Sequence, residues 1–278
     1  ASSGPIRIWR LPAGSGSLGD TPGEIALIEK TRVFVKKFTV SLLRKKRLYF
    51  SLLLMGVLLF GGQFAEMRRD DQTFASLLAH NPLHYQATID YYEAGERSMR
   101  FVEIGDDCLP LVVFIHGAPS SSAFWEELLR DSLLLSRAKL LAIDRPGYGY
   151  SGFGQPEISV ERQAAYIAEL LREKRAQHET IILHGSSYGG TVTARLAMDY
   201  PELVDGILLQ SAALMPGKET TYWISYPTHH WLLRWLMPGP IRVANAEKLS
   251  HKAQLKAMAP LWERIRSAAI VLHGTADR

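Results

Sequence analysis

The chain has 278 residues, of which 47% are hydrophobic and 22% are charged, and this composition excludes an intrinsically disordered protein. The formal net charge is +4, yet eight Lys or Arg and no acid lie between residues 30 and 47, so the remainder of the chain is acidic. A basic cluster beside an apolar run is a signal of membrane topology more often than a nucleic-acid-binding surface, and no nucleic-acid partner is expected. The single cysteine, Cys108, cannot form an internal disulfide and is expected to be partly buried.

The N-terminal segment is predicted to contain a disordered basic tail over residues 1–47. An apolar stretch then covers residues 48–65, just long enough to cross a bilayer, and predicts a transmembrane signal anchor. A cleaved signal peptide is the alternative, but a cut after Ala65 would place Gln63 where a small residue is preferred. A buried helix is a third reading. With cations before the span, the N-terminus is expected to be cytoplasmic and the following domain extracytoplasmic, or secreted or periplasmic after cleavage.

A linker with an amphipathic stretch is predicted over residues 66–85, and alternating strand and helix patterns follow it. Residues 86–93 and 98–104 flank the turn Ala94-Gly95 and predict a hairpin. Short apolar runs are typical of strands covered on both faces of a parallel sheet. They cover residues 111–115, 140–143, 181–184, 207–209 and 269–272, with helical patterns near 122–130, 160–175 and 188–199. The alternation predicts an α/β three-layer sandwich with a mostly parallel sheet.

The strongest motif places Ser187 on a sharp turn between an apolar strand and a helix. It reads Gly185-Ser186-Ser187-Tyr188-Gly189, with Gly190 next. A nucleophilic serine needs its hydroxyl held clear of the sheet, and glycines on both sides remove side chains that would clash there. This nucleophile elbow predicts attack by Ser187 on a carbonyl group.

A second motif, His116-Gly117-Ala118-Pro119, follows the strand at 111–115. Acyl transfer needs two preorganised N–H donors for the developing oxyanion. The backbone N–H groups of Tyr188 and Ala118 are the candidate donors, because Pro119 has no N–H.

Asp144 opens a third motif, DRPGYGYS, at the next strand end. It precedes Ser187 in the chain, and we interpret it as a structural acid. We expect it to pair with Arg145 or to accept hydrogen bonds from backbone N–H groups of the Gly-rich loop.

These motifs, together with the terminal HGTAD, resemble the α/β-hydrolase superfamily in its branch with a small helical lid, over residues 86–278. The resemblance implies Ser187 as the nucleophile, Tyr188 and Ala118 as oxyanion donors and Asp277 as the triad acid. Ser186 stands where relatives often have His. A Ser nucleophile in place of Asp argues against the dehalogenase and epoxide-hydrolase branches.

The lid is expected at about 215–266, between the sixth and seventh strands. Its aromatic residues either line an apolar substrate pocket or pack the lid onto the core. The pocket candidates are Trp223, Tyr226, Trp231 and Trp235.

The order of a triad in this superfamily is Ser, acid, His, but only Arg278 follows Asp277 and all nine histidines precede it. We expect the natural chain to continue with a further strand and helix that carry the catalytic histidine. The 278 residues alone are expected to be inactive.

The sequence therefore predicts a membrane-anchored serine hydrolase acting on a small-molecule ester or amide, with carboxylesterase or lipase-like activity first. A prolyl-type aminopeptidase is an alternative, and it would need a lid carboxylate such as Glu219, Glu247 or Glu263 to hold an α-amine. A non-catalytic binding or scaffold protein is another. Nothing in the sequence requires a metal, nucleotide or other cofactor.

Overall fold

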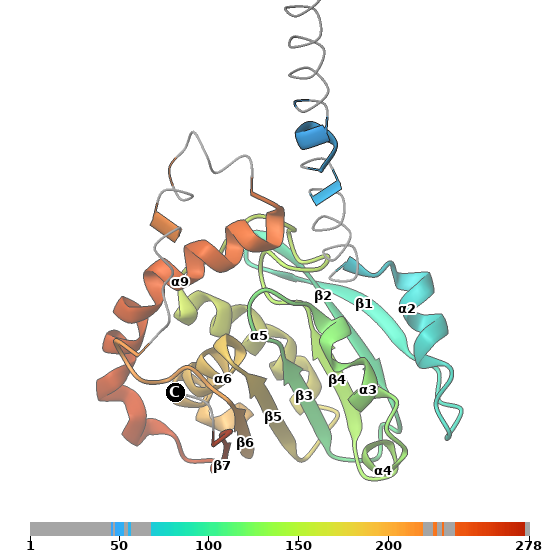
Figure 1. The fold of residues 1–278 in the computed structure, drawn as a ribbon. Helices are drawn as coiled ribbons and strands as arrows, with labels where there is room; N and C mark the ends of the chain where they lie inside the picture. Colours follow the sequence, from blue (N-terminus) through green and yellow to red (C-terminus); the bar gives the residue numbers. More distant parts are fainter. Residues whose placement is uncertain are drawn as a thin grey trace, which may run out of the picture. The chain divides into compact units, whose positions relative to one another are not determined.

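The computed structural model describes residues 46, 48–52, 55–56, 68–218, 225–226, 230 and 237–275. Residues 60–278 form one compact unit, and residues 1–59 form a separate one. The larger unit contains a seven-stranded sheet with helices on both faces (Figure 1). This arrangement confirms the predicted α/β fold class.

The sheet has the strand order β1-β2-β4-β3-β5-β6-β7. Strands β1 and β2 form an antiparallel hairpin, β2 pairs antiparallel with β4, and the pairs from β4 to β7 are parallel. The strands are β1 (Thr88–Ala94), β2 (Arg97–Ile104), β3 (Leu111–Ile115), β4 (Lys139–Ile143), β5 (Ile181–Ser186), β6 (Gly206–Gln210) and β7 (Ala268–Leu272).

The predicted helices are present, and the structure contains further helical segments that the sequence patterns did not predict. The stretch predicted as one helix near 122–130 divides into a 3₁₀ turn and a short α-helix, and the lid region contains a 20-residue helix, α9, that the sequence patterns did not identify. The elements are α2 (Asp71–Leu78), η2 (Ser122–Trp125), α3 (Glu126–Leu129), α4 (Ser132–Leu135), α5 (Val160–Arg175), α6 (Tyr188–Asp199), η3 (Pro201–Leu203), α9 (Gly239–Met258) and η4 (Ala259–Arg264).

The strands alternate between two apolar layers, because successive side chains of a strand point to opposite faces of a sheet. On β3, Leu111 and Val113 join the cluster packed by α5, α6 and the end of α9, whereas Phe114 joins the cluster on the other face. Phe74 of α2 is fully buried in that second cluster. The segment assigned from sequence to a linker therefore contains a helix that packs on the sheet.

The parallel register brings three strand ends together. Ile115 of β3 lies opposite both Ile143 of β4 and Gly185 of β5. The loops that follow these strands consequently meet at the carboxyl edge of the sheet, where ligands bind in open α/β sheets. The nucleophile elbow, the HGAP motif and the DRPGYGYS motif lie at these three strand ends.

The predicted transmembrane signal anchor over residues 48–65 is wrong for the part of the chain that the structure describes. There, no helix is both long and apolar enough to cross a membrane. Membrane association through this segment has no structural support. The predicted tail over residues 1–47 lies almost wholly outside the described residues.

Candidate active site

Ser187 occupies a strained turn between β5 and α6. Its backbone has φ 52° and ψ −120°, a left-handed conformation that is costly for a non-glycine residue. The surroundings fix this geometry through hydrogen bonds from Ser187 N to Gln210 O at 3.0 Å and from Gly190 N to Ser187 O at 3.0 Å. Ser187 is exposed, whereas its neighbours Ser186 and Tyr188 are buried. The turn therefore presents the hydroxyl at the start of α6, next to the positive end of the helix dipole.

The glycines around Ser187 are required by close packing. A Cβ on Gly185 would lie 2.2 Å from Thr193 Oγ1, and one on Gly189 would lie 2.2 Å from Ile115 O. A Cβ on Gly190 would lie 2.4 Å from Ala212 Cβ. The spacing of the motif thus reflects contacts of the elbow with β3, with the first turns of α6 and with the loop after β6.

The loop after β3 lies directly beside the elbow. A Cβ built on Gly117 would approach Ser187 Cβ to 3.1 Å and Ser187 Oγ to 3.7 Å. The structure therefore brings the segment of one candidate oxyanion donor, Ala118, next to the candidate nucleophile. The other candidate donor, Tyr188 N–H, belongs to the residue after Ser187.

Arg145 is a fully buried residue of this site that sequence reasoning did not assign to it. Its Nε donates to His116 O at 2.7 Å, and its Nη2 donates to Gly117 O at 3.1 Å. Its guanidinium also lies over the ring of Tyr188, 4.8 Å from the centroid. The sequence did contain a signal for this role, because the arginine of the DRPG motif follows β4, the strand next to β3.

Glu247 of α9 neutralises Arg145. The two side chains form a bidentate ion pair, with Nη1–Oε1 at 2.6 Å and Nη2–Oε2 at 3.3 Å, and both are fully buried. Gln163 and Tyr148 also donate to this carboxylate. Burial is the largest single influence and would lower the pKa of Arg145, but the charge and hydrogen bonding of Glu247, together with Tyr148 and Tyr188, outweigh it and raise that pKa. Because Glu247 is saturated by these partners, it is not free to hold the α-amine of a peptide substrate.

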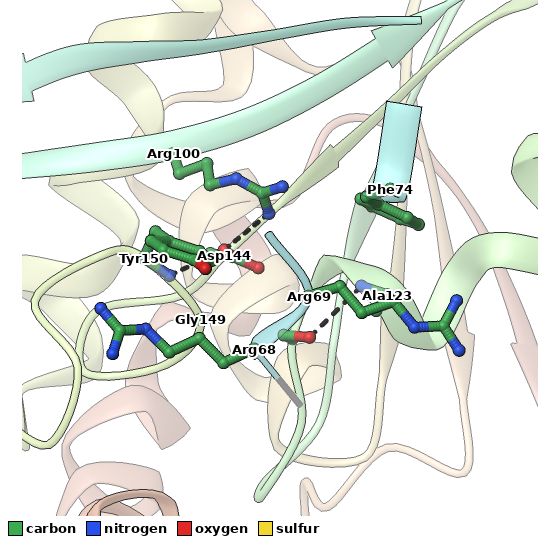
Figure 2. Close-up of a pocket in the computed structure, with 9 residues that line it drawn as sticks. Arg68, Arg69, Phe74, Arg100, Ala123, Asp144, Gly149 and Tyr150 are labelled. Atoms are coloured by element: carbon green, nitrogen blue, oxygen red, sulfur yellow. Dashed lines mark hydrogen bonds and ion pairs between the residues drawn. The ribbon is translucent and has the colours of Figure 1, made fainter. Parts of the chain in front are cut away.

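Asp144 has the structural role expected from sequence, but with a different cationic partner. Its carboxylate accepts from Ser122 N at 2.7 Å and from Tyr150 N at 3.0 Å, as expected for an acid that caps backbone groups. Its ion pair is with Arg100, not with Arg145, because the neighbouring side chains Asp144 and Arg145 point to opposite sides of the loop. Figure 2 shows Arg100 and Tyr150 converging on Asp144. The crevice lined by these residues has no room for a water molecule, so their side chains are closely packed and form no binding cavity.

His116 is held as one neutral tautomer. Its Nε2 accepts a hydrogen bond from Arg145 N at 3.0 Å, and a backbone N–H can only donate. The ring proton therefore resides on Nδ1, which contacts Gly117 O at 2.7 Å. With both nitrogens engaged, His116 is not available as a base for Ser187.

The stability of the protein is expected to fall as the pH drops below about 6.5, in part because of His116. Burial, followed by the positive charge of Arg145, holds the pKa of His116 well below its ordinary value of 6.5. Below that pH the unfolded chain binds a proton that the folded protein does not, so protonation favours unfolding. One such group lowers the free energy of unfolding by about 1.4 kcal/mol for each pH unit below its unfolded-state pKa. Above about pH 6.5 this loss of stability disappears.

Urea denaturation from about pH 7.5 to about pH 5.5 measures the slope of the free energy of unfolding against pH. In His116→Asn the free energy of unfolding should change less with pH, by the equivalent of nearly one bound proton. The pH dependence that remains should come from groups such as His184, whose pKa burial also lowers. The exposed His84 provides the control, His84→Asn, which should keep the wild-type slope. Equal slopes for His116→Asn and the wild type would contradict the assignment.

Several predicted site residues lie outside the described part of the chain. These are Asp277 and the lid residues Trp223, Trp231 and Trp235. Tyr226 is described and is 65% exposed. Within the described residues, no hydrogen bond joins the side chain of Ser187 to a histidine, and His116, His184 and His251 have other partners.

A separate surface pocket of about 270 Å³ lies at the opposite end of the sheet, beside the first residues of β3 and β5. Cys108 lines it and is exposed, contrary to the expectation of partial burial, because it lies in the surface loop between β2 and β3. Ser187 lies at the other end of β5. The pocket is therefore unrelated to the candidate active site.

Comparison with known proteins identifies the family. Residues 110–267, more than half of the chain, match the model of the alpha/beta hydrolase fold. The chain belongs to this family. The match contains the elbow and the DRPG segment, and it confirms the resemblance drawn from the motifs.

Curated relatives of this alpha/beta hydrolase are named for different activities. A 2-hydroxy-6-oxononadienedioate/2-hydroxy-6-oxononatrienedioate hydrolase of Pseudomonas sp. is 29% identical over 40% of this chain and 39% of its own length. A 1-acylglycerol-3-phosphate O-acyltransferase of Arabidopsis thaliana is 33% identical over 37% of this chain and 25% of its own length. The chain thus spans two fifths or less of these relatives.

Solved structures show the same fold at low identity. A 2-hydroxy-6-oxo-6-phenylhexa-2,4-dienoate hydrolase from Rhodococcus sp. superposes with a TM-score of 0.55 and 20% identity, over 70% of this chain and 83% of that one. A bacterial membrane phospholipase A superposes with a TM-score of 0.51 and 20% identity, over 82% of each chain. These likenesses establish the fold alone.

Proposed function

We propose that this alpha/beta hydrolase is a serine hydrolase that cleaves ester-like bonds through a covalent intermediate on Ser187. The observation that carries the proposal is the exposed Ser187 on its strained turn at the start of α6, with the Gly117 backbone beside it. Strain of this kind persists only where the surrounding structure enforces it, and it is typical of functional sites. A carboxylesterase or lipase-like substrate is the first class to test.

In the proposed reaction, Ser187 Oγ attacks the carbonyl carbon of the ester while a histidine base takes the hydroxyl proton. The backbone N–H groups of Tyr188 and Ala118 stabilise the oxyanion. The alcohol leaves with a proton from the histidine, and a water molecule activated by the same histidine then hydrolyses the acyl-enzyme. Asp277 is the proposed acid that orients the base. The described residues do not supply this histidine.

A serine nucleophile supports acyl chemistry over epoxide opening. Epoxide hydrolase 1 of Caenorhabditis elegans is 26% identical over 42% of this chain and 29% of its own length. The corresponding branch of the superfamily attacks with a carboxylate, whereas the elbow here presents the hydroxyl of Ser187. An alkoxide formed at that position adds readily to a carbonyl carbon and gives the acyl-enzyme.

Labelling of the full-length protein with a fluorophosphonate probe tests the proposal, since the probe reacts only with an activated serine. We expect one adduct, which peptide mapping should assign to Ser187 and not to the adjacent Ser186. Prior heat denaturation should abolish the labelling. A folded full-length protein that remains unlabelled would reject the serine-hydrolase mechanism and favour a non-catalytic binding role. Labelled protein should next be given p-nitrophenyl esters of increasing acyl length and prolyl peptide amides.

A further inference from the structure

We propose that Arg145 is a positioning residue for the oxyanion hole and that Glu247 of α9 holds it in place. The inference rests on the proposed function, because an oxyanion forms only if Ser187 attacks a carbonyl group. Arg145 itself is fully buried and touches the donor segments without reaching the reacting atoms.

The first step of the argument is the orientation of the peptide group between Gly117 and Ala118. The carbonyl oxygen of Gly117 is contacted by Arg145 Nη2 at 3.1 Å and by the protonated His116 Nδ1 at 2.7 Å. In a trans peptide group, the carbonyl and the following N–H point in opposite directions. Fixing Gly117 O toward Arg145 therefore turns the Ala118 N–H away from it. A donor fixed before the reaction needs no reorganisation when charge develops.

The second step is the contact of Arg145 with the other donor segment. The guanidinium lies over the ring of Tyr188, 4.8 Å from its centroid, and the ring of His251 from α9 lies 4.7 Å from the same tyrosine ring. One side chain thus contacts the two segments whose backbone N–H groups form the proposed oxyanion hole.

The third step is the way in which Arg145 is itself held. An arginine has five N–H donors, and the structure gives Arg145 five hydrogen bonds. The acceptors of Arg145 are His116 O, Gln163 Oε1, Gly117 O and the two oxygens of Glu247. Glu247 thus accepts two of the five hydrogen bonds, and it lies on a helix 102 residues later in the chain. Lysine keeps the charge but lacks the planar fork that these five directions require.

The test is steady-state kinetics of Arg145→Lys in the full-length protein with a p-nitrophenyl ester. Lysine can still pair with Glu247, but it cannot also hold the carbonyl oxygens of His116 and Gly117. We expect kcat to fall by about 10- to 100-fold and KM to change by less than about twofold. A trifluoromethyl ketone, which forms a tetrahedral adduct with the serine, should lose affinity by the same factor as kcat/KM. A purely structural role would not link these two losses.

Arg100→Lys is the matched control. Arg100 is also buried and paired with a buried aspartate, Asp144, but its hydrogen bonds go to Asp71, Ser122 and Asp144. We expect this variant to be destabilised with kcat unchanged.

The outcomes separate the inference from the proposed function. Wild-type protein without fluorophosphonate labelling would overturn both. A labelled wild type with a folded Arg145→Lys variant of unchanged kcat, or with a change confined to KM, would overturn the positioning role alone. If Arg145→Lys does not melt cooperatively, the double variant Arg145→Met with Glu247→Met removes both buried charges together and is judged by the same kinetic criteria.

Discussion

Replacing Ser187 with alanine is expected to lower kcat for ester hydrolysis by about 10⁴-fold or more. The proposed mechanism forms its covalent intermediate on this hydroxyl, and the adjacent hydroxyl of Ser186 belongs to a buried residue. Because Ser187 is exposed, the loss of its hydroxyl leaves no buried polar group without a partner. The melting temperature of Ser187→Ala should therefore remain close to that of the wild type.

Ser186→Ala is the matched control for this prediction. Ser186 is the last residue of β5 and is 9% exposed, so its hydroxyl lies away from the solvent that Ser187 faces. Progress curves with a p-nitrophenyl ester should give a near-wild-type kcat for Ser186→Ala. Retention of more than about a hundredth of the wild-type kcat by Ser187→Ala would assign the chemistry to another group.

Gly189→Ala is expected to lower the free energy of unfolding by about 3 kcal/mol and kcat by about 100-fold. The new methyl group would lie 2.2 Å from Ile115 O and 2.5 Å from His116 O. Both are backbone atoms at the end of β3, and neither can rotate away as a flexible side chain could. Relief of the clash must displace either α6 or the loop that contains Gly117, and each displacement separates the nucleophile from an oxyanion donor.

Gly206→Ala provides the comparison within the same sheet. A Cβ on Gly206 meets its nearest neighbour, a side-chain carbon of Ile182, at 3.5 Å, which is an ordinary contact. We expect a change of less than about 1 kcal/mol and unaltered kinetics. Chemical denaturation of both variants measures the difference. A Gly189→Ala variant as stable and active as Gly206→Ala would contradict the packing argument for the elbow.

Much of this fold could be predicted from local patterns. The apolar run at 111–115 predicts β3 with its observed bounds, since a strand buried on both faces needs an uninterrupted apolar sequence between turn residues. The elbow could be placed for a similar reason. A glycine two residues before and two residues after Ser187 reflects contacts that no larger side chain would allow. These constraints act within a few residues, so the sequence displays them directly.

Contacts between distant segments could not be predicted in this way. The ion pair between Arg145 and Glu247 could be predicted only if it were known that α9 packs against the loop after β4. The hydrophobic periodicity of a sequence does not indicate which distant segments pack together. Of the two alternatives for Asp144, the hydrogen bonds from backbone N–H groups are observed, whereas its ion pair is with Arg100 and not with Arg145. The choice between the two cations could not be predicted, because it depends on which side of the loop each side chain faces. The transmembrane prediction failed differently. Hydropathy counts the apolar residues in a window, and this count does not test whether a described helix is both long and apolar enough to cross a membrane.

The ion pair between Arg145 and Glu247 has a consequence for how the chain folds. Its two charges are separated by 102 residues, so their encounter requires closure of a long loop, and such contacts form slowly. Until α9 docks, the guanidinium remains hydrated, because burying an unpaired charge is too costly. The loop after β3 then lacks the donor that orients its carbonyl groups. Secondary structure can therefore form early in refolding, whereas the backbone around Ser187 reaches its final conformation only when α9 docks and the long-range ion pair forms.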